Sequence, residues 1–369
     1  MQTQITIIFP FRDRDATRVR LSLQSLELQS SKDFEVIFVD YGSQDSYANS
    51  VKNTVNNFDF VSYMYVGHPG LLWNKSKALN YGIKTAKSQY IVTADVDVLF
   101  GETFIEKALD LAKSNTFSLF KIGYLSQKIT EQQQSELNLK AIETKFIGDT
   151  FGIGLYPKLA LEKVGGVDEF FHFYGSEDQD LNYRISLTET SLSNCDDVLL
   201  YHQWHPRYPQ KSNKQLTQMP RLSNALRINQ RHFIRHQEES LLHPNSKNWG
   251  FVYKKNDKLL LEESRHKIEL SNVSSHITHF FREEIKQYND SVVTVVVTEA
   301  PYYKSLKHLI KKLLGKQTQP YMSMKEVNDL ILKEIIFTYR DYNYSYLVSE
   351  NLNQIFFTIQ LNINSYDGL

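Results

Sequence analysis

Tyr90-Ile-Val-Thr-Ala-Asp95-Val-Asp97-Val-Leu-Phe100 is the stretch around which the rest of the chain can be arranged. Ile91 to Ala94 has the continuous apolar character of a buried strand, and this strand ends in two carboxylates one residue apart. In an open α/β sheet, ligands bind beyond the carboxyl ends of the strands. Asp95 and Asp97 can therefore offer oxygen ligands to a divalent cation, although an isolated pair of this kind more often only caps a turn.

The chain before this stretch repeats a strand-then-helix pattern. Continuous apolar runs, of the kind that parallel sheets bury on both faces, alternate with segments whose apolar residues have helical spacing. This alternation predicts an α/β fold with a doubly wound, mostly parallel sheet. The expected strands are 5–10, 34–39, 60–66 and 91–94, and the expected helices lie around 19–28, 47–55 and 74–86.

The composition narrows the classes of partner. The 42 basic residues balance the 42 acidic ones, which argues against a nucleic-acid binder, because such a protein must neutralise phosphates. Cys195 is the single cysteine, so no internal disulfide forms and a reducing, cytoplasmic location is expected. The start of the chain does not resemble a signal peptide, and no apolar run reaches the ~18 to 20 residues of a membrane span. We expect a soluble protein, or one peripheral to the inner face of a membrane.

Several other polar residues stand in positions that suit chemistry. Asp40 ends the second expected strand and suits a uracil ring or a ribose hydroxyl, although alone it is equally well explained as a turn former. Lys75 lies near a helix start, where the helix dipole also attracts anions. Glu177-Asp-Gln-Asp180 places three carboxylates in four residues, which require a positive partner, a metal-bound substrate or a raised pKa. His202 and His205 are close enough in sequence to reach one cation.

Three motifs, taken in order, resemble those of one enzyme family. Phe9-Pro-Phe-Arg-Asp-Arg14, Trp73-Asn-Lys-Ser-Lys-Ala-Leu-Asn80 and Asp95-Val-Asp97 look like the successive motifs of the metal-dependent β-1,4-galactosyltransferases and their bacterial relatives. They are also similar to the broader inverting, nucleotide-sugar glycosyltransferases of the GT-A fold, including the chondroitin-synthase type that transfers galactosyl or N-acetylgalactosaminyl groups. One such motif is weak evidence, whereas three in order are strong.

Two later segments extend the resemblance. Asp149-Thr-Phe-Gly-Ile-Gly154 resembles the family's segment leading into the acceptor site. Phe173-Tyr-Gly-Ser-Glu-Asp-Gln-Asp-Leu181 looks like the family's aromatic-Gly-Gly-Glu-Asp-Asp-Asp signature, with Ser176 for the second Gly and Gln179 for the second Asp. These departures predict an acceptor that differs from that of the animal enzymes.

The resemblance implies a single in-line displacement at the anomeric carbon of a UDP-sugar, with inversion. Asp97, His205 and His202 match the family's metal ligands, and the Mn²⁺ or Mg²⁺ that they hold would act as a Lewis acid for the UDP leaving group. Asp178 matches the general base on the acceptor hydroxyl, and Glu177 would orient the acceptor. The residues expected around the donor are Pro10, Arg12, Arg14, Asp40, Lys75, Asp95, Thr150 and Gly175.

The resemblance also assigns individual roles around the donor. Arg12 and Asp40 would bind the uridine, Lys75 the phosphates and Asp95 the sugar hydroxyls. In the family, the residue matching Thr150 lies beside the C2 substituent of the sugar, where a Tyr restricts the donor to galactose and smaller side chains admit N-acetylgalactosamine. Thr150 therefore implies that UDP-GalNAc is used at least as well as UDP-Gal. The expected acceptor is a saccharide or a lipid-linked saccharide, in the synthesis of a bacterial surface polysaccharide.

Two other functions remain to be weighed. A catalytically idle, sugar-nucleotide-binding scaffold of a polysaccharide-assembly complex would keep the fold, but it would not need a full set of metal ligands together with Asp178. A nucleotidyl transferase would carry a glycine-rich, basic phosphate loop near the N-terminus, and Pro10-Phe-Arg-Asp contains no glycine.

The sequence predicts a domain boundary near residue 240. Residues 1–240 form the expected GT-A domain and residues 241–369 an α/β or helical accessory domain of unknown role, with strands expected at 291–298 and 354–361. Residues 304–316 would form a helix with an apolar stripe on one side and lysines on the other side. This pattern fits a peripheral helix on an anionic membrane, but packing on its own domain is favoured because surface helices are commonly amphipathic.

Overall fold

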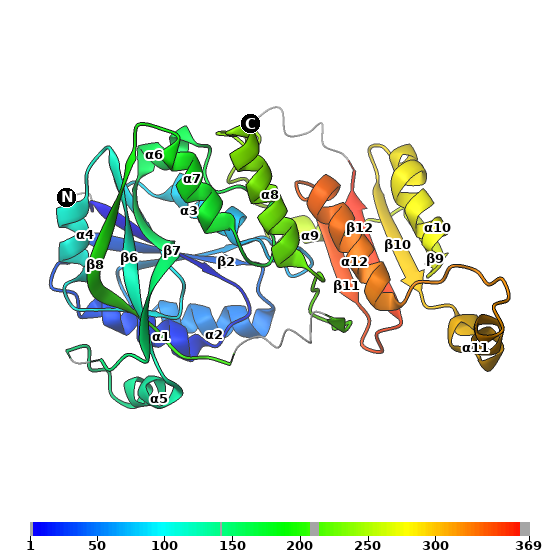
Figure 1. Ribbon diagram of the computed structural model, residues 1–369, viewed down its shortest axis with the longest axis horizontal. Helices are drawn as coiled ribbons and strands as arrows, with labels where there is room; N and C mark the ends of the chain where they lie inside the picture. Colours follow the sequence, from blue (N-terminus) through cyan, green and yellow to red (C-terminus); the bar gives the residue numbers. More distant parts are fainter. Residues whose placement is uncertain (1–2, 141, 207–213, 362–369) are drawn as a thin grey trace. The chain divides into compact units, whose positions relative to one another are not determined.

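The computed structural model describes residues 3–140, 142–206 and 214–361, and it divides into two compact units (Figure 1). The first unit comprises Met1–Gly67, Trp73–Arg207 and Leu226–Val252. The second comprises His68–Leu72, Tyr208–Ala225 and Tyr253–Leu369. Each unit has its own sheet.

The described part of the first unit is built on an eight-stranded sheet with the order β3-β2-β1-β4-β7-β6-β8-β5. Its strands are mostly parallel, and only β7 and β5 run against their neighbours. The α/β fold predicted from the sequence, with its mostly parallel sheet, is therefore confirmed. The strands are β1 Ile5–Phe11, β2 Phe34–Tyr41, β3 Val61–Val66, β4 Tyr90–Thr93, β5 Val98–Phe100, β6 Thr116–Tyr124, β7 Phe146–Pro157 and β8 Ser191–His202.

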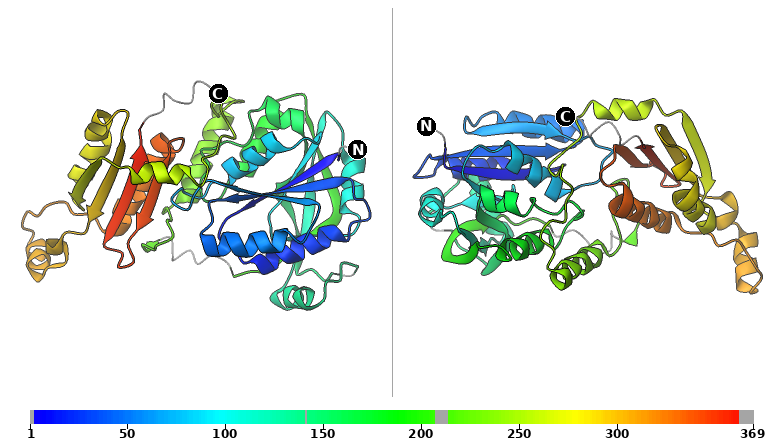
Figure 2. Two further views of the ribbon diagram at one scale, coloured as in Figure 1. Left: turned by 180° about the vertical axis from the view of Figure 1, so that it is seen from behind. Right: turned by 90° about the horizontal axis from the view of Figure 1, so that it is seen from above.

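Helices cover both faces of this sheet (Figure 1 and Figure 2). Every residue of β1 is buried. Its odd-numbered residues share a core cluster with apolar residues of α1 and α2, whereas Ile8 faces α3. Gly82 of α3 permits this approach, because a Cβ there would lie 2.5 Å from Ile8 Cγ2. The helices are α1 Ala16–Glu27, α2 Asp45–Val55, α3 Lys75–Thr85, α4 Phe104–Leu111, α5 Gln127–Ser135, α6 Lys158–Lys163, α7 Glu177–Ser186 and α8 Ala225–Glu239.

The first unit extends to Val252, past the boundary expected at 240. Asn245 Nδ2 donates to the carbonyl oxygens of Gly165 and Val167, each at 2.8 Å. The Trp249 ring lies 3.8 Å below the Lys84 ammonium. These contacts attach residues 241–252, whose composition is that of a linker, to the first unit.

The second unit contains a four-stranded sheet with the order β11-β12-β10-β9. β9 and β10 are parallel, and β12 is antiparallel to both of its neighbours. Alternate residues of β12 are buried, which gives this sheet one face toward its helices. Its elements are α9 Asp257–Glu262, β9 His266–Ser271, α10 Ser274–His279, β10 Val292–Thr298, α11 Leu306–Leu313, α12 Met324–Glu334, β11 Tyr344–Val348 and β12 Gln354–Gln360, with short π or 3₁₀ segments at Phe280–Glu284, Ile285–Gln287, Pro301–Lys304 and Ile335–Tyr339.

Helix α11 exposes the face that the sequence analysis expected to be buried. His308 is its buried residue, 5% exposed, and its ring contacts the rings of Tyr302, Tyr303 and Tyr321. The apolar stripe lies on the other side of the helix, and its members are exposed. The prediction that the stripe packs on its own domain is therefore wrong. The side of the helix that faces the domain carries His308, which packs against the three tyrosine rings. The exposed members are Leu306, Leu309, Ile310, Leu313 and Leu314.

Across the described ranges, none of the helices has both the length and the apolar character required to cross a membrane.

Candidate active site

The first polar cluster forms where β5 pairs with β8. The antiparallel register sets Val98 opposite His202, and Gln203 N donates to Asp97 O at 2.9 Å. This pairing brings the end of β8 beside the second carboxylate of the Asp95-Val-Asp97 loop. His205 Nε2 lies 3.4 Å from Asp97 Oδ2, and His202 Nε2 lies 3.8 Å from Asp97 Oδ1. We call these three side chains the Asp97 cluster.

The Asp97 cluster fits a divalent cation. Its three ligand atoms lie within 4.8 Å of one another. Adjacent ligand atoms in an octahedral shell with bonds of about 2.1 Å lie about 3 Å apart, so the three atoms are near the spacing at which they could share one ion. Asp97 Oδ1 is also buried without a hydrogen-bond partner. A buried carboxylate oxygen of this kind costs free energy unless a ligand satisfies it.

The second polar cluster surrounds Lys75 at the start of α3. Lys75 Nζ lies 3.3 Å from Asp95 Oδ1, 3.5 Å from Asp178 Oδ2 and 3.7 Å from Glu177 Oε1. These carboxylates come from the loop after β4 and from the first turn of α7. Lys75, expected from the sequence to contact phosphates, is thus the positive partner that the Glu177-Asp178 pair requires. We call these four side chains the Lys75 cluster.

The electrostatics of the Lys75 cluster suit proton transfer. Burial raises the pKa of Asp178, the Lys75 charge lowers it, and repulsion from Glu177 and Asp95 raises it again, with a result of about 7. Burial would lower the pKa of Lys75, but the carboxylates of Asp178, Asp95 and Glu177 raise it well above its usual value. A carboxyl with a pKa near neutrality, beside a permanent ammonium charge, is suited to act as a general base at physiological pH.

Backbone geometry holds Asp178 in place. Its carboxylate packs on Gly152 of β7, where an added Cβ would lie 2.6 Å from Asp178 Oδ2. Gly152 N donates to Thr150 Oγ1 at 3.2 Å. Thr150, the expected donor-specificity residue, therefore helps to fix the backbone at Gly152. Gly175 has φ +101°, and a Cβ there would lie 2.4 Å from Leu226 Cδ1. Gly175 is therefore required where the loop before α7 meets α8.

The expected uridine-binding residues lie at the carboxyl ends of β1 and β2. Asp40 is fully buried, and its carboxylate accepts hydrogen bonds from Ser43 N at 3.1 Å and Tyr63 Oη at 2.7 Å. Burial raises the pKa of Asp40, although these hydrogen bonds oppose the shift. In this conformation Asp40 orders the loop after β2. Arg12 Nε lies 3.6 Å from Asp13 Oδ2.

Two further expected donor-site residues differ in their exposure. Pro10 is buried within β1, whereas Arg14 is exposed in the loop before α1. Neither belongs to the Asp97 or the Lys75 cluster, and Arg14 is the more accessible of the two.

Sequence reasoning missed the contribution of α8. Asn229 Nδ2 donates to His172 O at 3.1 Å and to Tyr174 O at 3.0 Å, so α8 supports the loop that leads into Glu177. Arg18 was also missed, and its Nη1 lies 4.0 Å from Asp97 Oδ2. Asn229 gave no usable signal, because an isolated Asn in a helical segment has no recognisable spacing.

A comparison with protein families finds a match for part of the first unit. Residues 6–161 match the model of glycosyl transferase family 2. The match supports a glycosyltransferase family 2 domain in this segment, which contains Lys75, Asp95 and Asp97 but ends before Asp178, His202 and His205.

Curated relatives carry similar names. An uncharacterized glycosyltransferase of Rickettsia felis is 28% identical over 130 residues, which are 35% of this chain and 20% of that protein. A hyaluronan synthase of Pasteurella multocida is 23% identical over 213 residues, 47% of this chain and 22% of that protein. The chain thus spans about a fifth of the length of these two relatives. A solved mannosyltransferase from Pyrobaculum calidifontis, in complex with GDP-Man and Mn²⁺, is 18% identical with a TM-score of 0.41, over 58% of this chain and 60% of that one.

Proposed function

We propose that this protein is a metal-dependent, inverting glycosyltransferase that moves galactose or N-acetylgalactosamine from a UDP-sugar to a saccharide or lipid-linked saccharide acceptor. The observation that carries the proposal is the division of one short loop between two clusters. Asp97 belongs to the Asp97 cluster, whose side chains could hold a cation, and Asp95 belongs to the Lys75 cluster, which contains the candidate base. Donor activation and acceptor activation would then occur side by side. The hyaluronan synthase among the relatives supports a role in polysaccharide synthesis.

Asp97, His202 and His205 would hold Mn²⁺ or Mg²⁺ in this proposal. The Asp97 carboxylate suits either cation, and the two imidazoles favour a transition-metal ion such as Mn²⁺ over Mg²⁺. When bound, the ion would neutralise the diphosphate and act as a Lewis acid for the departing UDP. Arg18, beside Asp97, adds a second positive charge on the same side of the cluster.

Asp178 would accept the proton of the acceptor hydroxyl. The oxygen forms a bond to the anomeric carbon as the bond from that carbon to the UDP oxygen breaks, and UDP leaves with the electron pair. A single displacement inverts the anomeric centre. Lys75 keeps Asp178 and Glu177 together despite their like charges, and Asp95 connects this cluster to the donor side.

The direct test is an incubation of the full chain with UDP-GalNAc or UDP-Gal, Mn²⁺ and a panel of saccharide acceptors. We expect UDP release that depends on metal and acceptor, together with a product of inverted anomeric configuration by NMR. UDP-sugar binding with neither hydrolysis nor transfer to any acceptor would favour the idle scaffold.

Thr150→Tyr is predicted to change donor choice. In the position that the resemblance assigns to it, Thr150 would leave space beside the C2 substituent and offer a hydroxyl, and pocket differences of this size are worth ~1 to 3 kcal/mol. The wild type should therefore use UDP-GalNAc at least as well as UDP-Gal, and the variant should shift toward UDP-Gal. The ratio of kcat/KM values for the two donors measures this. A strong wild-type preference for UDP-Gal that the substitution leaves unchanged would show that Thr150 does not face the C2 group.

We also propose that α11 binds the surface of an anionic membrane, at the inner face if the protein is cytoplasmic. Leu306 and Leu313 are 77% and 86% exposed, on the side of the helix opposite the buried His308. At 100° per residue, Lys307 and Lys312 of the same helix flank this stripe on its two sides. An exposed apolar stripe between lysines matches a helix that lies in the headgroup region.

Vesicle co-sedimentation should test α11. We expect the protein to bind phosphatidylglycerol vesicles at low salt and not pure phosphatidylcholine vesicles. Changing Lys307, Lys311 and Lys312 to Gln should weaken binding roughly 100-fold, since each lysine contributes about 1 kcal/mol. Leu306→Asp with Leu313→Asp should abolish binding, whereas Leu159→Asp, at an equally exposed leucine of α6, should not. No binding of the wild type to the anionic vesicles would eliminate the proposal.

A further inference from the structure

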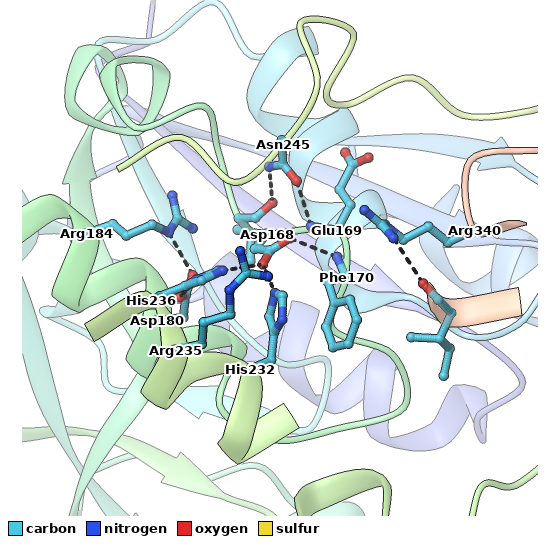
Figure 3. A network of polar contacts seen from close by, with 12 residues as sticks. Asp168, Glu169, Phe170, Asp180, Arg184, His232, Arg235, His236, Asn245 and Arg340 are labelled. Carbon is cyan, nitrogen blue, oxygen red and sulfur yellow. Dashed lines mark hydrogen bonds and ion pairs between the residues drawn. The ribbon is translucent and has the colours of Figure 1, made fainter. Parts of the chain in front are cut away.

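The structure contains a second group of side chains that could hold a metal ion. It shares no residue with the Asp97 cluster or the Lys75 cluster. It consists of Asp168, from the loop after α6, and His232 and His236, one turn apart on α8 (Figure 3). In Figure 3 both imidazoles point toward the Asp168 carboxylate. We call these side chains the α8 histidine cluster. We propose that it binds a zinc-like divalent cation that fixes α8 to the loop containing Asp168.

The spacing of the ligand atoms fits such an ion. His232 Nε2 lies 2.8 Å from Asp168 Oδ2, and His236 Nε2 lies 3.7 Å from the same oxygen. Ligand atoms of a tetrahedral zinc with bonds of about 2.0 to 2.1 Å lie about 3.3 Å apart. The two distances lie on either side of this value, and all three ligand atoms lie within 4.8 Å of one another. Binding would displace the proton that His232 and Asp168 otherwise share.

The surrounding contacts orient the ligands. His236 Nδ1 donates to Asp180 Oδ1 at 2.5 Å, which leaves Nε2 to face Asp168. A metal-binding histidine almost always makes this kind of hydrogen bond from its other nitrogen to a carboxylate. The Phe170 ring stacks on His232 at 3.7 Å, and Phe170 N donates to Asp168 Oδ1 at 2.9 Å. That hydrogen bond leaves Asp168 Oδ2 as the oxygen directed at both histidines.

The charges of the site favour a cation. Asp168, Asp180 and Arg184 are all buried, and Arg184 Nε donates to Asp180 Oδ2 at 2.7 Å. With neutral imidazoles, two carboxylates and one guanidinium leave an excess negative charge inside the protein. Such a charge is costly unless a positive partner compensates for it. The competing explanation is a protonated histidine, and the experiment below distinguishes the two.

The position of this cluster gives the ion a structural role. Asp180 lies one turn after the Glu177-Asp178 pair on α7, and Asn229 on α8 supports the loop before that pair. An ion at the α8 histidine cluster would join α8 to the Asp168 loop, and the hydrogen bond from His236 to Asp180 would extend this connection to α7. It would therefore set the position of the candidate base without contacting substrate.

The test uses a chain in which the Asp97 cluster can no longer bind a metal ion. In a chain with Asp97→Asn and His205→Ala, dialysed against Zn²⁺ and then against metal-free buffer, mass spectrometry should find about one zinc per chain. Adding His232→Gln should remove it, because glutamine retains hydrogen bonding but ligates zinc poorly. Adding His276→Gln, at an exposed histidine of α10, should not. Zinc that survives His232→Gln would overturn the proposal.

A second measurement needs no change in the α8 histidine cluster. Co²⁺ added to the same Asp97→Asn, His205→Ala chain should give the visible absorption bands of a four-coordinate complex, and a chelator should lower its Tm. A folded chain that binds neither Zn²⁺ nor Co²⁺, with a Tm indifferent to chelator, would overturn the proposal and favour the protonated histidine.

Discussion

Asp178→Asn is expected to lower kcat for sugar transfer by about 10²-fold or more, the range for loss of a general base. Asparagine preserves the size of the side chain but cannot accept the acceptor proton. Lys75 still has Asp95 and Glu177 as partners, at 3.3 and 3.7 Å, so the fold and the binding of donor and metal should persist. Steady-state kinetics with Mn²⁺, together with calorimetric titration of UDP, separates the effect on transfer from the effect on binding.

The pH profile gives an independent test of Asp178. Because its pKa is raised to about 7, the ionised base is lost as the pH falls through neutrality. Wild-type kcat/KM should therefore decline about tenfold per pH unit below 7 and level off above it. The Asn variant should lose this inflection, while Asp110→Asn, at an exposed carboxylate of α4, should keep it. Normal turnover by Asp178→Asn would transfer the role to Glu177, because both oxygens of the buried Asp180 already accept hydrogen bonds from Arg184 and His236.

His205→Ala is the second change with a large expected effect. The imidazole lies 3.4 Å from Asp97 Oδ2 and is 30% exposed, so its removal should affect metal binding without unfolding the domain. Loss of an outer partner of a metal ligand typically costs ~10 to 100-fold, and loss of a ligand should cost at least as much. Mn²⁺ affinity by calorimetry, activity as a function of Mn²⁺ concentration, and Tm are the three measurements.

The exposed His276 of α10 offers a matched control for this variant. His276→Ala should leave all three measurements unchanged. If His205→Ala retains the wild-type dependence on Mn²⁺, His205 is not a ligand. The match between the residues after Asp180 and the family's metal ligands would then be incorrect. His202→Ala would then show whether Asp97 has any histidine partner at all.

The central strands were predictable because a sheet covered on both faces requires continuous apolar runs. Ile5–Phe11 and Phe34–Tyr41 are buried almost throughout, and they stand out in the sequence for that reason. The long strands β7 and β8 were not predicted. Half or more of their residues are not buried, so their hydrophobic pattern is weak.

The candidate site was only partly predictable, because some of its contacts join residues that are far apart in the sequence. Asp97, His202 and His205 do lie together, in accordance with the resemblance. The partners of Lys75 could not be inferred, because the approach of the start of α7 to the start of α3 joins residues about a hundred positions apart. The orientation of α11 was equally hidden, since an amphipathic helix does not reveal which of its faces the protein covers.

The shared loop also limits how the two halves of the reaction can move. Asp95 and Asp97 are separated by two peptide units, which span at most ~7 Å. The proposed cation ligand and the carboxylate that contacts Lys75 are therefore tied by covalent bonds, and no hinge between them can change their separation by more than a few ångströms. Closure over a bound sugar would have to come from the segments around this loop. An insertion between these aspartates should uncouple leaving-group departure from proton removal even if both clusters formed.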